Sequence, residues 1–439
     1  MSKIPKLETF KGLQGVSTLI LIISSSYVGD RENRLNIPQA FNQAGHMAIY
    51  FIFVLSSFLF SYKWYNKMIP PQKELLSNGK NSPIIKNSSN SQIFKPSKRD
   101  LLFSILKVIF KIYPLYVIVL IFYGGVAIPT FDELFWRRLF MLPAQSYSHL
   151  WPVRVGFCYA LLVPVFQLLS AHFLDIEHKS TEAGKSSHAH KIMLGAITFI
   201  AIWINCVGYV YSFGEDLAPL WQHFPVFWYG TLSGIICFYL ERNKYTLYKP
   251  QKRGFWKYGE IIIYTILGYI TLTNQATSAA FLRKYTILCT SSAVWATPLY
   301  GLLLIFIALT EGETSLGKFL RSNLFIWAGE LTYSIYLIVF VPIICILNIN
   351  IRGFEAVLSI IFLSCWVGWG FHRYIEENGI KLGDTLIRTL GGEVNSDKRV
   401  TYSQIEESNS KLDFLANVNS PPTYDGKGTQ VEMKIEKEV

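Results

Sequence analysis

The run MAIYFIFVLSSFLFSY, residues Met47–Tyr62, decides the fold class. It contains no charged residue and is dominated by aromatic and aliphatic side chains. A helix that spans a lipid bilayer needs roughly 20 consecutive, mainly apolar residues. The run therefore predicts a membrane-spanning helix.

Similar apolar runs recur along most of the chain. Together with the first run they predict about ten spans, with bounds uncertain by a few residues each. For the most N-terminal run, Leu13–Val28, a secretory signal is the alternative, but no small-residue cleavage pattern follows that run. The predicted fold is an all-α, polytopic bundle of about ten transmembrane helices, with spans at Leu13–Val28, Met47–Tyr62, Leu101–Val126, Leu150–Leu169, Ile192–Tyr211, Leu220–Leu240, Ile261–Thr273, Thr286–Leu309, Leu324–Leu347 and Ala356–Phe371.

The overall composition agrees with a membrane protein. Of the 439 residues, 51% are hydrophobic and 16% are charged, whereas soluble domains carry about 25% charged residues. This shortage of charge argues against a soluble enzyme and against a disordered chain. The net charge of +11 lies in loops between apolar runs rather than on one basic stripe, so no nucleic-acid partner is predicted.

The distribution of Lys and Arg predicts the orientation. The loops on one side, together with both termini, hold about thirty Lys and Arg, whereas the opposite loops hold about seven. The positive-inside rule therefore places both termini in the cytosol. Both the endoplasmic reticulum and the plasma membrane fit this topology. We expect a membrane domain over residues 1–376, with a flexible cytosolic loop at 64–100, and a largely disordered cytosolic tail over 377–439.

Four segments in order along the chain resemble one protein family. Leu7–Gly15 (LETFKGLQG), Met47–Phe58 (MAIYFIFVLSSF), His149–Phe157 (HLWPVRVGF) and Gly329–Leu337 (GELTYSIYL) are similar to conserved segments of the acyltransferase-3 family of membrane acyltransferases, in its fungal-type form. Three shorter segments extend the similarity, Lys111–Tyr116 (KIYPLY), Phe224–Gly230 (FPVFWYG) and, more loosely, Tyr374–Glu376 (YIE). The resemblance covers about residues 7–376.

The resemblance implies transfer of an acyl group from acyl-CoA to a hydroxyl group. In that family a basic residue and a histidine in the first span, a glutamate in the fourth-span motif and a histidine in the ninth-span motif supply the chemistry. The corresponding positions here are Gln14, Ser25, Gly156 and Val339. A histidine of near-neutral pKa can take the proton of the attacking hydroxyl, and a serine cannot act as that base. The chain therefore resembles the family in fold and departs from it in chemistry.

Arg154 is the first candidate for a replacement catalytic residue. It lies about one turn into the fourth span, where an ionisable side chain is costly unless it faces a cavity or a partner. An interfacial arginine that snorkels to the lipid headgroups is the alternative. His149 and His223, at the non-cytosolic ends of their spans, could also replace the lost base, although interfacial packing explains them equally simply.

Substrate binding is assigned to five residues in or near the motifs, namely Lys107, Lys111, Tyr113, Trp151 and Tyr333. Lys107 and Lys111 lie one helical turn apart and share a face, where they could bind the phosphates of CoA or an anionic lipid. Anchoring at the cytosolic surface is the alternative for this pair. No metal site is predicted, because no Cys pair has metal-ligand spacing.

Three functions fit these features. The first is acyl-CoA-dependent O-acyl transfer to a lipid, a sugar or a secondary metabolite, by an altered site that uses acyl-CoA as co-substrate and no bound cofactor. The second is a catalytically inactive pseudoenzyme that binds an acyl donor or a lipid. The third is transport of a small lipophilic molecule. Fold alone does not choose among them.

The tail contains a motif for a protein partner. Pro421-Pro422-Thr423-Tyr424 matches the P-P-x-Y pattern that WW domains bind, and Pro-rich segments already favour the extended conformation that is bound. We therefore predict that a WW-domain ubiquitin ligase binds the cytosolic tail.

We expect Tyr424→Ala to abolish capture of the full-length protein by an immobilised WW domain, because the tyrosine completes the motif. Tyr402→Ala, which changes a tail tyrosine outside the motif, is the matched control and should leave capture unchanged. Equal capture of the Tyr424→Ala variant and the unaltered protein would show that the motif match is accidental.

Overall fold

The computed structural model describes residues 5–29, 40–68, 98–127, 133–140, 150–182, 188–210, 223–242, 258–259, 261–266, 292–310, 315–349 and 351–391. The regular elements in these ranges are all helices, which confirms the predicted all-α class. The elements are α1 (Pro5–Gly29), α2 (Ala40–Met68), α3 (Lys98–Ala127), α4 (Glu133–Leu139), α5 (Trp151–Glu182), α6 (Ala189–Val210), α7 (Phe224–Arg242), α11 (Ser292–Leu309), α12 (Ser315–Leu320), α13 (Asn323–Glu330), α14 (Thr332–Ile338), α15 (Phe340–Asn348), α16 (Gly353–Phe371), the π-helix η6 (His372–Glu376) and α17 (Glu377–Thr389).

Among the described residues, four helical segments are long and apolar enough to cross a membrane. They are Met47–Asn66, Leu102–Phe122, Pro152–Ile176 and Gly353–Thr389, and two shorter apolar helices cover Ala189–Ile204 and Ala296–Leu309. The four long segments overlap predicted spans two, three, four and ten. The described residues thus fit an integral membrane protein with several apolar helices, whereas the total of about ten spans stays a prediction.

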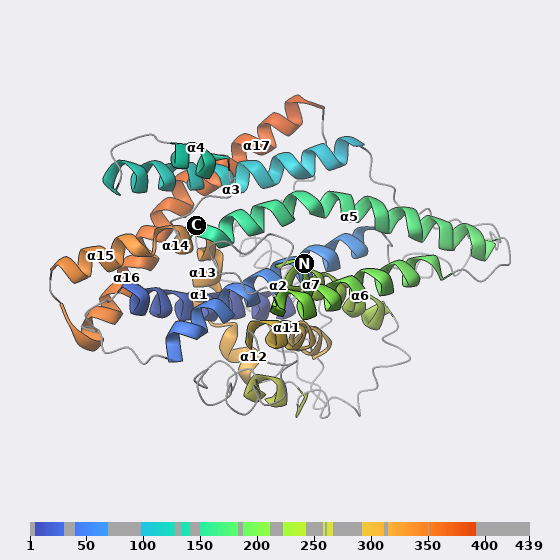
Figure 1. The fold of residues 1–439 in the computed structure, drawn as a ribbon, viewed down its shortest axis with the longest axis horizontal. Coiled ribbons are helices and arrows are strands. Elements are labelled where there is room, and N and C mark those ends of the chain that lie inside the picture. The colour runs from blue at the N-terminus through green and yellow to red at the C-terminus, as the bar shows by residue number, and fades with distance from the viewer. Residues whose placement is uncertain are drawn as a thin grey trace, which may run out of the picture.

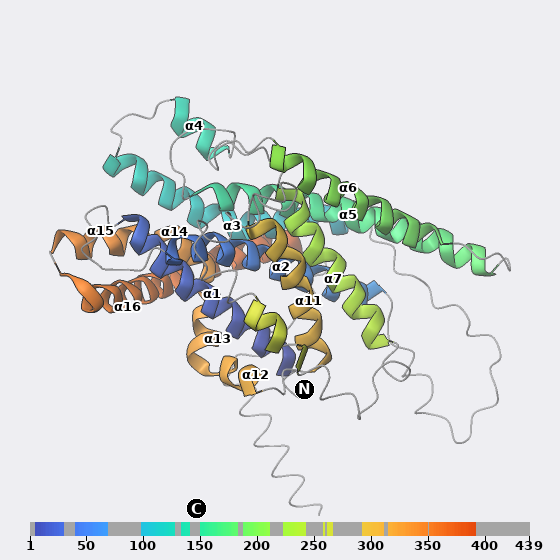
Figure 2. The ribbon, with the colours of Figure 1, turned by 60° about the horizontal axis from the view of Figure 1, so that its bottom comes forward.

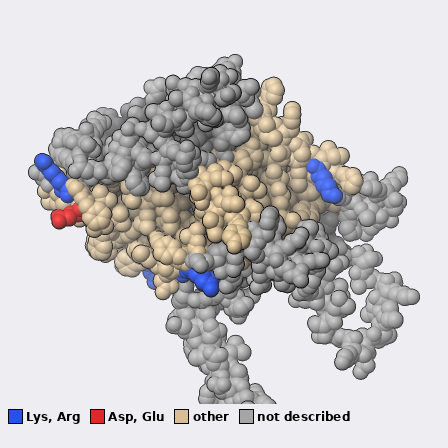
Figure 3. Space-filling model, turned by 90° about the horizontal axis from the view of Figure 1, so that it is seen from below, with Lys and Arg blue, Asp and Glu red and all other residues tan. Residues whose placement is uncertain are grey.

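Large apolar side chains cover much of the outer surface. On α6 and α16, aromatic and aliphatic residues are more than half exposed, namely Ile192, Phe199, Trp203, Phe354, Phe362 and Trp366. On the face drawn in Figure 3, the described surface carries few charges. Soluble proteins rarely expose large contiguous apolar patches. Contact with lipid explains this surface.

Two helices cross the middle of the molecule and organise the rest. Figure 1 shows α1 and α2 there, with α3, α4 and α17 on one side and α11 and α12 on the other. Helix α2 packs against α1, α7 and α11, whereas α1 packs against α13. Figure 2 shows α5 and α6 lying alongside each other.

Glycines allow the closest of these contacts. A Cβ atom at Gly230 or Gly234 of α7 would collide with Ser57 and Ser61 of α2 and with the α2 backbone. Gly230 and Gly234 form a G-x-x-x-G sequence, a spacing that lets helix backbones approach closely. At Gly12, Gly15 and Gly329 an added Cβ would likewise meet backbone atoms across the α1–α12–α13 contact. These glycines set the spacing of the central helices.

The structure differs from the sequence expectations in two segments. The predicted span Leu324–Leu347 is divided among α13, α14 and α15, with turns at Leu331 and Val339. The first residues of the predicted tail form α17, which packs against α3. Gly379 and Gly383 of α17 lie directly against Phe110 of α3, so a hydrophilic but amphipathic segment is ordered there.

We expect Gly230→Ala to lower the free energy of unfolding by about 1–3 kcal/mol, because the added methyl group overpacks a backbone contact. Thermal unfolding of the purified protein in detergent measures the change. Gly195→Ala on α6 is the control, since nothing lies within 4 Å of a Cβ at that position. A Gly230→Ala variant as stable as the control would contradict the proposed role of close α2–α7 packing.

Candidate functional site

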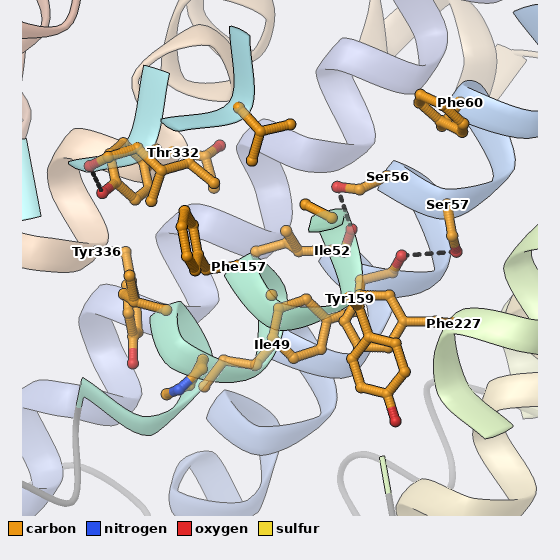
Figure 4. A pocket seen from close by; sticks show the side chains of 18 of the residues that line it. Ile49, Ile52, Ser56, Ser57, Phe60, Phe157, Tyr159, Phe227, Thr332 and Tyr336 are labelled. Carbon is orange, nitrogen blue, oxygen red and sulfur yellow. Dashed lines mark hydrogen bonds between the residues drawn. The ribbon is translucent and has the colours of Figure 1, made fainter. Parts of the chain in front are cut away.

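A cavity of about 380 Å³ lies between the central helices. Helices α1, α2, α3, α5, α7 and α14 each contribute to its wall, and Figure 4 shows side chains from these elements converging on it. Its lining is mainly aliphatic and aromatic, with Leu21, Ile49, Ile52, Phe53, Phe60, Val108, Ile112, Pro152, Val153, Phe157, Tyr159, Ala160, Val163, Phe227 and Tyr336 among the residues. This volume falls in the range typical of small-molecule pockets.

The cavity brings together four residues that the sequence singled out. Gln14, Lys111, Gly156 and Tyr333 all line it, although they lie on α1, α3, α5 and α14. Each belongs to a different one of the segments that resemble the acyltransferase-3 family. Residues separated by up to about three hundred positions in the chain thus share one wall.

Other predicted site residues lie outside this lining. Val339 is 1% exposed and packs in an apolar cluster with Ile22 and Leu331. Lys107 is exposed on α3, and Ser25 is partly buried on α1. The Tyr113 hydroxyl donates to the carbonyl oxygen of Leu139 at 2.6 Å.

Two further groups of predicted residues have no described side-chain position. Trp151 begins α5, but its side chain lies outside the described part of the structure, as does that of His149. Pro421, Pro422 and Tyr424 of the tail lie beyond the described residues altogether. The WW-domain motif therefore stays a sequence prediction.

The hydroxyl groups around the cavity donate to backbone carbonyls. Ser56 donates to Ile52 at 2.7 Å, and Ser57 donates to Phe53 at 2.9 Å (Figure 4). The Tyr333 hydroxyl donates to the carbonyl oxygen of Ile112 at 2.6 Å. The two serine bonds satisfy each hydroxyl within its own helix, whereas the Tyr333 bond joins α14 to α3. The cavity therefore presents mostly hydrocarbon to a ligand.

Stacked aromatic rings form one side of the cavity. Phe227 of α7 stacks on Tyr159 of α5 with ring centroids 4.1 Å apart and on Phe53 of α2 at 4.8 Å. Figure 4 shows Tyr159 and Phe227 close together. Such stacks add about 0.5–1.5 kcal/mol beyond the burial of the rings. This side of the cavity is therefore well packed.

Lys111 is the only side chain with a formal charge among the described residues that line the cavity. That described lining contains no histidine or carboxylate side chain. It therefore offers no general base of the usual kind to a molecule in the cavity. The described residues also contain no group of three or more His, Cys, Asp or Glu side chains arranged to hold a metal ion. The geometry fits binding of an apolar chain with one cationic contact.

A buried acid–histidine cluster lies next to the cavity wall, and the sequence analysis did not find it. Glu376 is 4% exposed, and its Oε2 atom accepts a hydrogen bond from Ser334 at 3.0 Å. The same oxygen lies 2.9 Å from Nδ1 of His372, one turn earlier in η6. Nε2 of His372 lies 3.9 Å from Glu377. The signal in the sequence was the i, i+4 spacing of His372 and Glu376 at the end of an apolar helix.

The hydrogen bond between Ser334 and Glu376 joins α14 to η6, the segment between α16 and α17. Ser334 follows Tyr333, whose side chain lines the cavity, and Glu376 is on the π-helix between α16 and α17. Both ring nitrogens of His372 face carboxylates, so the imidazole is held in place rather than presented to a ligand. The cluster therefore positions a wall of the cavity.

We expect Glu376→Gln to lower the free energy of unfolding by about 2 kcal/mol, because the amide removes a charged partner of His372 and Ser334. Unfolding in detergent micelles, followed by circular dichroism, gives the value. Glu355→Gln changes an exposed acid on α16 and should be nearly neutral. Equal stabilities of the two variants would mean that the cluster holds nothing in place.

Comparison with known proteins adds no relative from which a role could be carried over. No family model matches the chain, and no curated protein or solved structure matches it.

Proposed function

We propose that this is a multi-pass membrane protein of the acyltransferase-3 type that binds the acyl chain of an acyl donor, such as acyl-CoA, in the cavity. The observation that carries this proposal is the convergence of Gln14, Lys111, Gly156 and Tyr333 on one apolar cavity. Each of these residues lies in a segment that resembles the family. The sequence alone does not require the four residues to lie close together in space.

The lining chemistry supports an acyl chain as the ligand. Burial of a methylene group contributes about 0.8 kcal/mol, so a hydrocarbon chain gains affinity steadily from an apolar wall. Lys111 supplies one positive charge at that wall. A lysine ammonium binds phosphate as a point charge, which suits the phosphates of CoA or of an anionic lipid.

The same lining argues for slow transfer or none. At the family positions, Gly156 faces the cavity without a side chain, and Ser25 and Val339 lie outside the lining. General-base catalysis contributes about 10²–10⁴ in rate, and that contribution is missing here. Positioning of an acyl donor beside a hydroxyl acceptor still accelerates a reaction substantially. Acyl-donor binding without efficient turnover, as in a pseudoenzyme, fits the geometry best.

We further propose that the full chain crosses the membrane about ten times, with both termini in the cytosol. The excess of Lys and Arg in the loops on one side supports this orientation. The exposed apolar side chains of α6 and α16 support contact with membrane lipids. The endoplasmic reticulum and the plasma membrane both agree with this arrangement.

We expect Ala160→Leu to weaken binding of radiolabelled palmitoyl-CoA by about tenfold or more, because the added carbons occupy the cavity that the chain would fill. Binding is measured on the purified protein in nanodiscs, with release of free CoA recorded in the same samples. Ala196→Leu on the exposed side of α6 is the matched control and should bind normally.

The two measurements separate the alternatives. Binding without CoA release supports the pseudoenzyme, whereas release that depends on a hydroxyl acceptor and is lost in Ala160→Leu supports a slow acyltransferase. Palmitoyl-CoA binding that is equal in Ala160→Leu and Ala196→Leu would refute the assignment of the cavity to an acyl chain.

A further inference from the structure

Arg154 is a partly buried cation, and its Nε donor has no partner among the residues that the structure describes. It lies in the first turn of α5, and its Nε atom is inaccessible to water and forms no hydrogen bond. Within the part of the chain that the structure describes, no acidic side chain forms an ion pair with Arg154. Lys111, by contrast, is exposed and lines the cavity. A guanidinium group such as that of Arg154, with a buried and unsatisfied donor, is costly inside a membrane protein.

The described groups on which the charge of Arg154 acts are a histidine and a cysteine. His223, which is 6% exposed, lies close enough for the guanidinium charge to act on its ring. The same charge acts on Cys158, one turn further along α5. The ring of Tyr50 on α2 packs at 6.1 Å from the ring of His223. The groups on which the guanidinium charge acts, His223 and Cys158, carry no carboxylate.

The first half of α5 contacts the first turn of α7. Tyr159 of α5 contacts Phe224 and Phe227 of α7, and further along both helices Phe166 contacts Trp228. Because the contacts advance in the same direction on both helices, their N-termini lie at the same end. Each N-terminus carries a partial positive charge, which adds to that of Arg154.

Snorkelling explains this arrangement incompletely. A snorkelling arginine lays its aliphatic stem along apolar groups and places its charged head in water. Here the Nε donor of that head is itself buried without a partner. A planar guanidinium binds a phosphate or carboxylate through two parallel hydrogen bonds, and Nε is one of the donors available for such a pair.

We propose that Arg154, beside His223 and the first turns of α5 and α7, binds the phosphate group of an anionic amphiphile. Neither Arg154 nor His223 lines the cavity assigned to the acyl chain, so this is a second site on another face of α5. The ligand chemistry is an oxyanion, and its source is either a lipid headgroup or free phosphate. The inference does not depend on the function proposed for the cavity.

The test uses the full-length protein in a neutral maltoside detergent and four probes. Dodecyl phosphate carries the anion and a chain, dodecanol carries the chain alone, inorganic phosphate carries the anion alone, and dodecyltrimethylammonium carries the opposite charge. Intrinsic tryptophan fluorescence follows each titration. We expect dodecyl phosphate to bind at least about tenfold more tightly than dodecanol, because a hydrogen bond to a charged group is among the strong ones.

Variants test whether the preference for dodecyl phosphate over dodecanol depends on the guanidinium group of Arg154. Arg154→Gln should remove the preference for dodecyl phosphate over dodecanol, and Arg154→Lys should reduce it by keeping the charge without the paired donors. Arg137→Gln, at an exposed arginine of α4, is the matched control and should keep it. Ala160→Leu, which fills the other cavity, should also keep it, so this result is separate from that of the acyl-chain assay.

The outcomes are decisive in both directions. Loss of the preference for dodecyl phosphate in Arg154→Gln supports the site. Tight binding of inorganic phosphate that is also lost in Arg154→Gln would identify free phosphate as the ligand. A preference that persists in Arg154→Gln, or equal binding of dodecyl phosphate and dodecanol to the unaltered protein, overturns the proposal. If Arg154→Gln fails to fold, the comparison of Arg154→Lys with Arg137→Gln decides the question in the same way.

Discussion

The close approach of helix backbones at glycine is the constraint on which the structure depends. Lipid tails are as apolar as the helices, so hydrophobic burial does not drive helix association in a membrane, and close packing must do so instead. Gly230 and Gly234 bring α7 onto α2, and Gly15 and Gly329 bring α1 onto α13. With α1, α2 and α7 fixed in this way, Gln14, Ile49 and Phe227 reach one cavity. Larger residues at these glycines would separate the walls of that cavity.

The sequence predicted most of the helices because the apolar runs are long and nearly uncharged. It did not predict the turns at Leu331 and Val339, since the hydropathy of Leu324–Leu347 stays high across both. Polar groups near the first turn are satisfied locally, as when Thr332 donates to Gly329 at 2.8 Å. Helix α17 was missed for the opposite reason. Its mean composition is hydrophilic, and its packing depends on glycines facing Phe110, which hydropathy does not register.

Helix geometry explains which site residues the sequence could place. Gln14 and Ser25 lie on nearly the same face of α1, about 16 Å apart along the helix axis, and the cavity is lined by Gln14 and not by Ser25. Arg154 and Gly156 are two positions apart, which puts them about 200° apart around α5. Because Gly156 faces the cavity, Arg154 faces away from it. The motif His149–Phe157 identifies candidate residues, but it does not predict which face of α5 each of them occupies.

The two faces of α5 have opposite chemistry, and the difference follows from how their polar groups are satisfied. Around the cavity, hydroxyls such as those of Ser57 and Tyr333 donate to backbone carbonyls, so the wall offers few free polar groups to a ligand. At the other face, Arg154 keeps a buried donor that the described residues do not satisfy. A hydrocarbon chain gains from the first environment and an oxyanion from the second. The two proposed sites, one for an apolar chain and one for an oxyanion, therefore lie on different faces of the same helix.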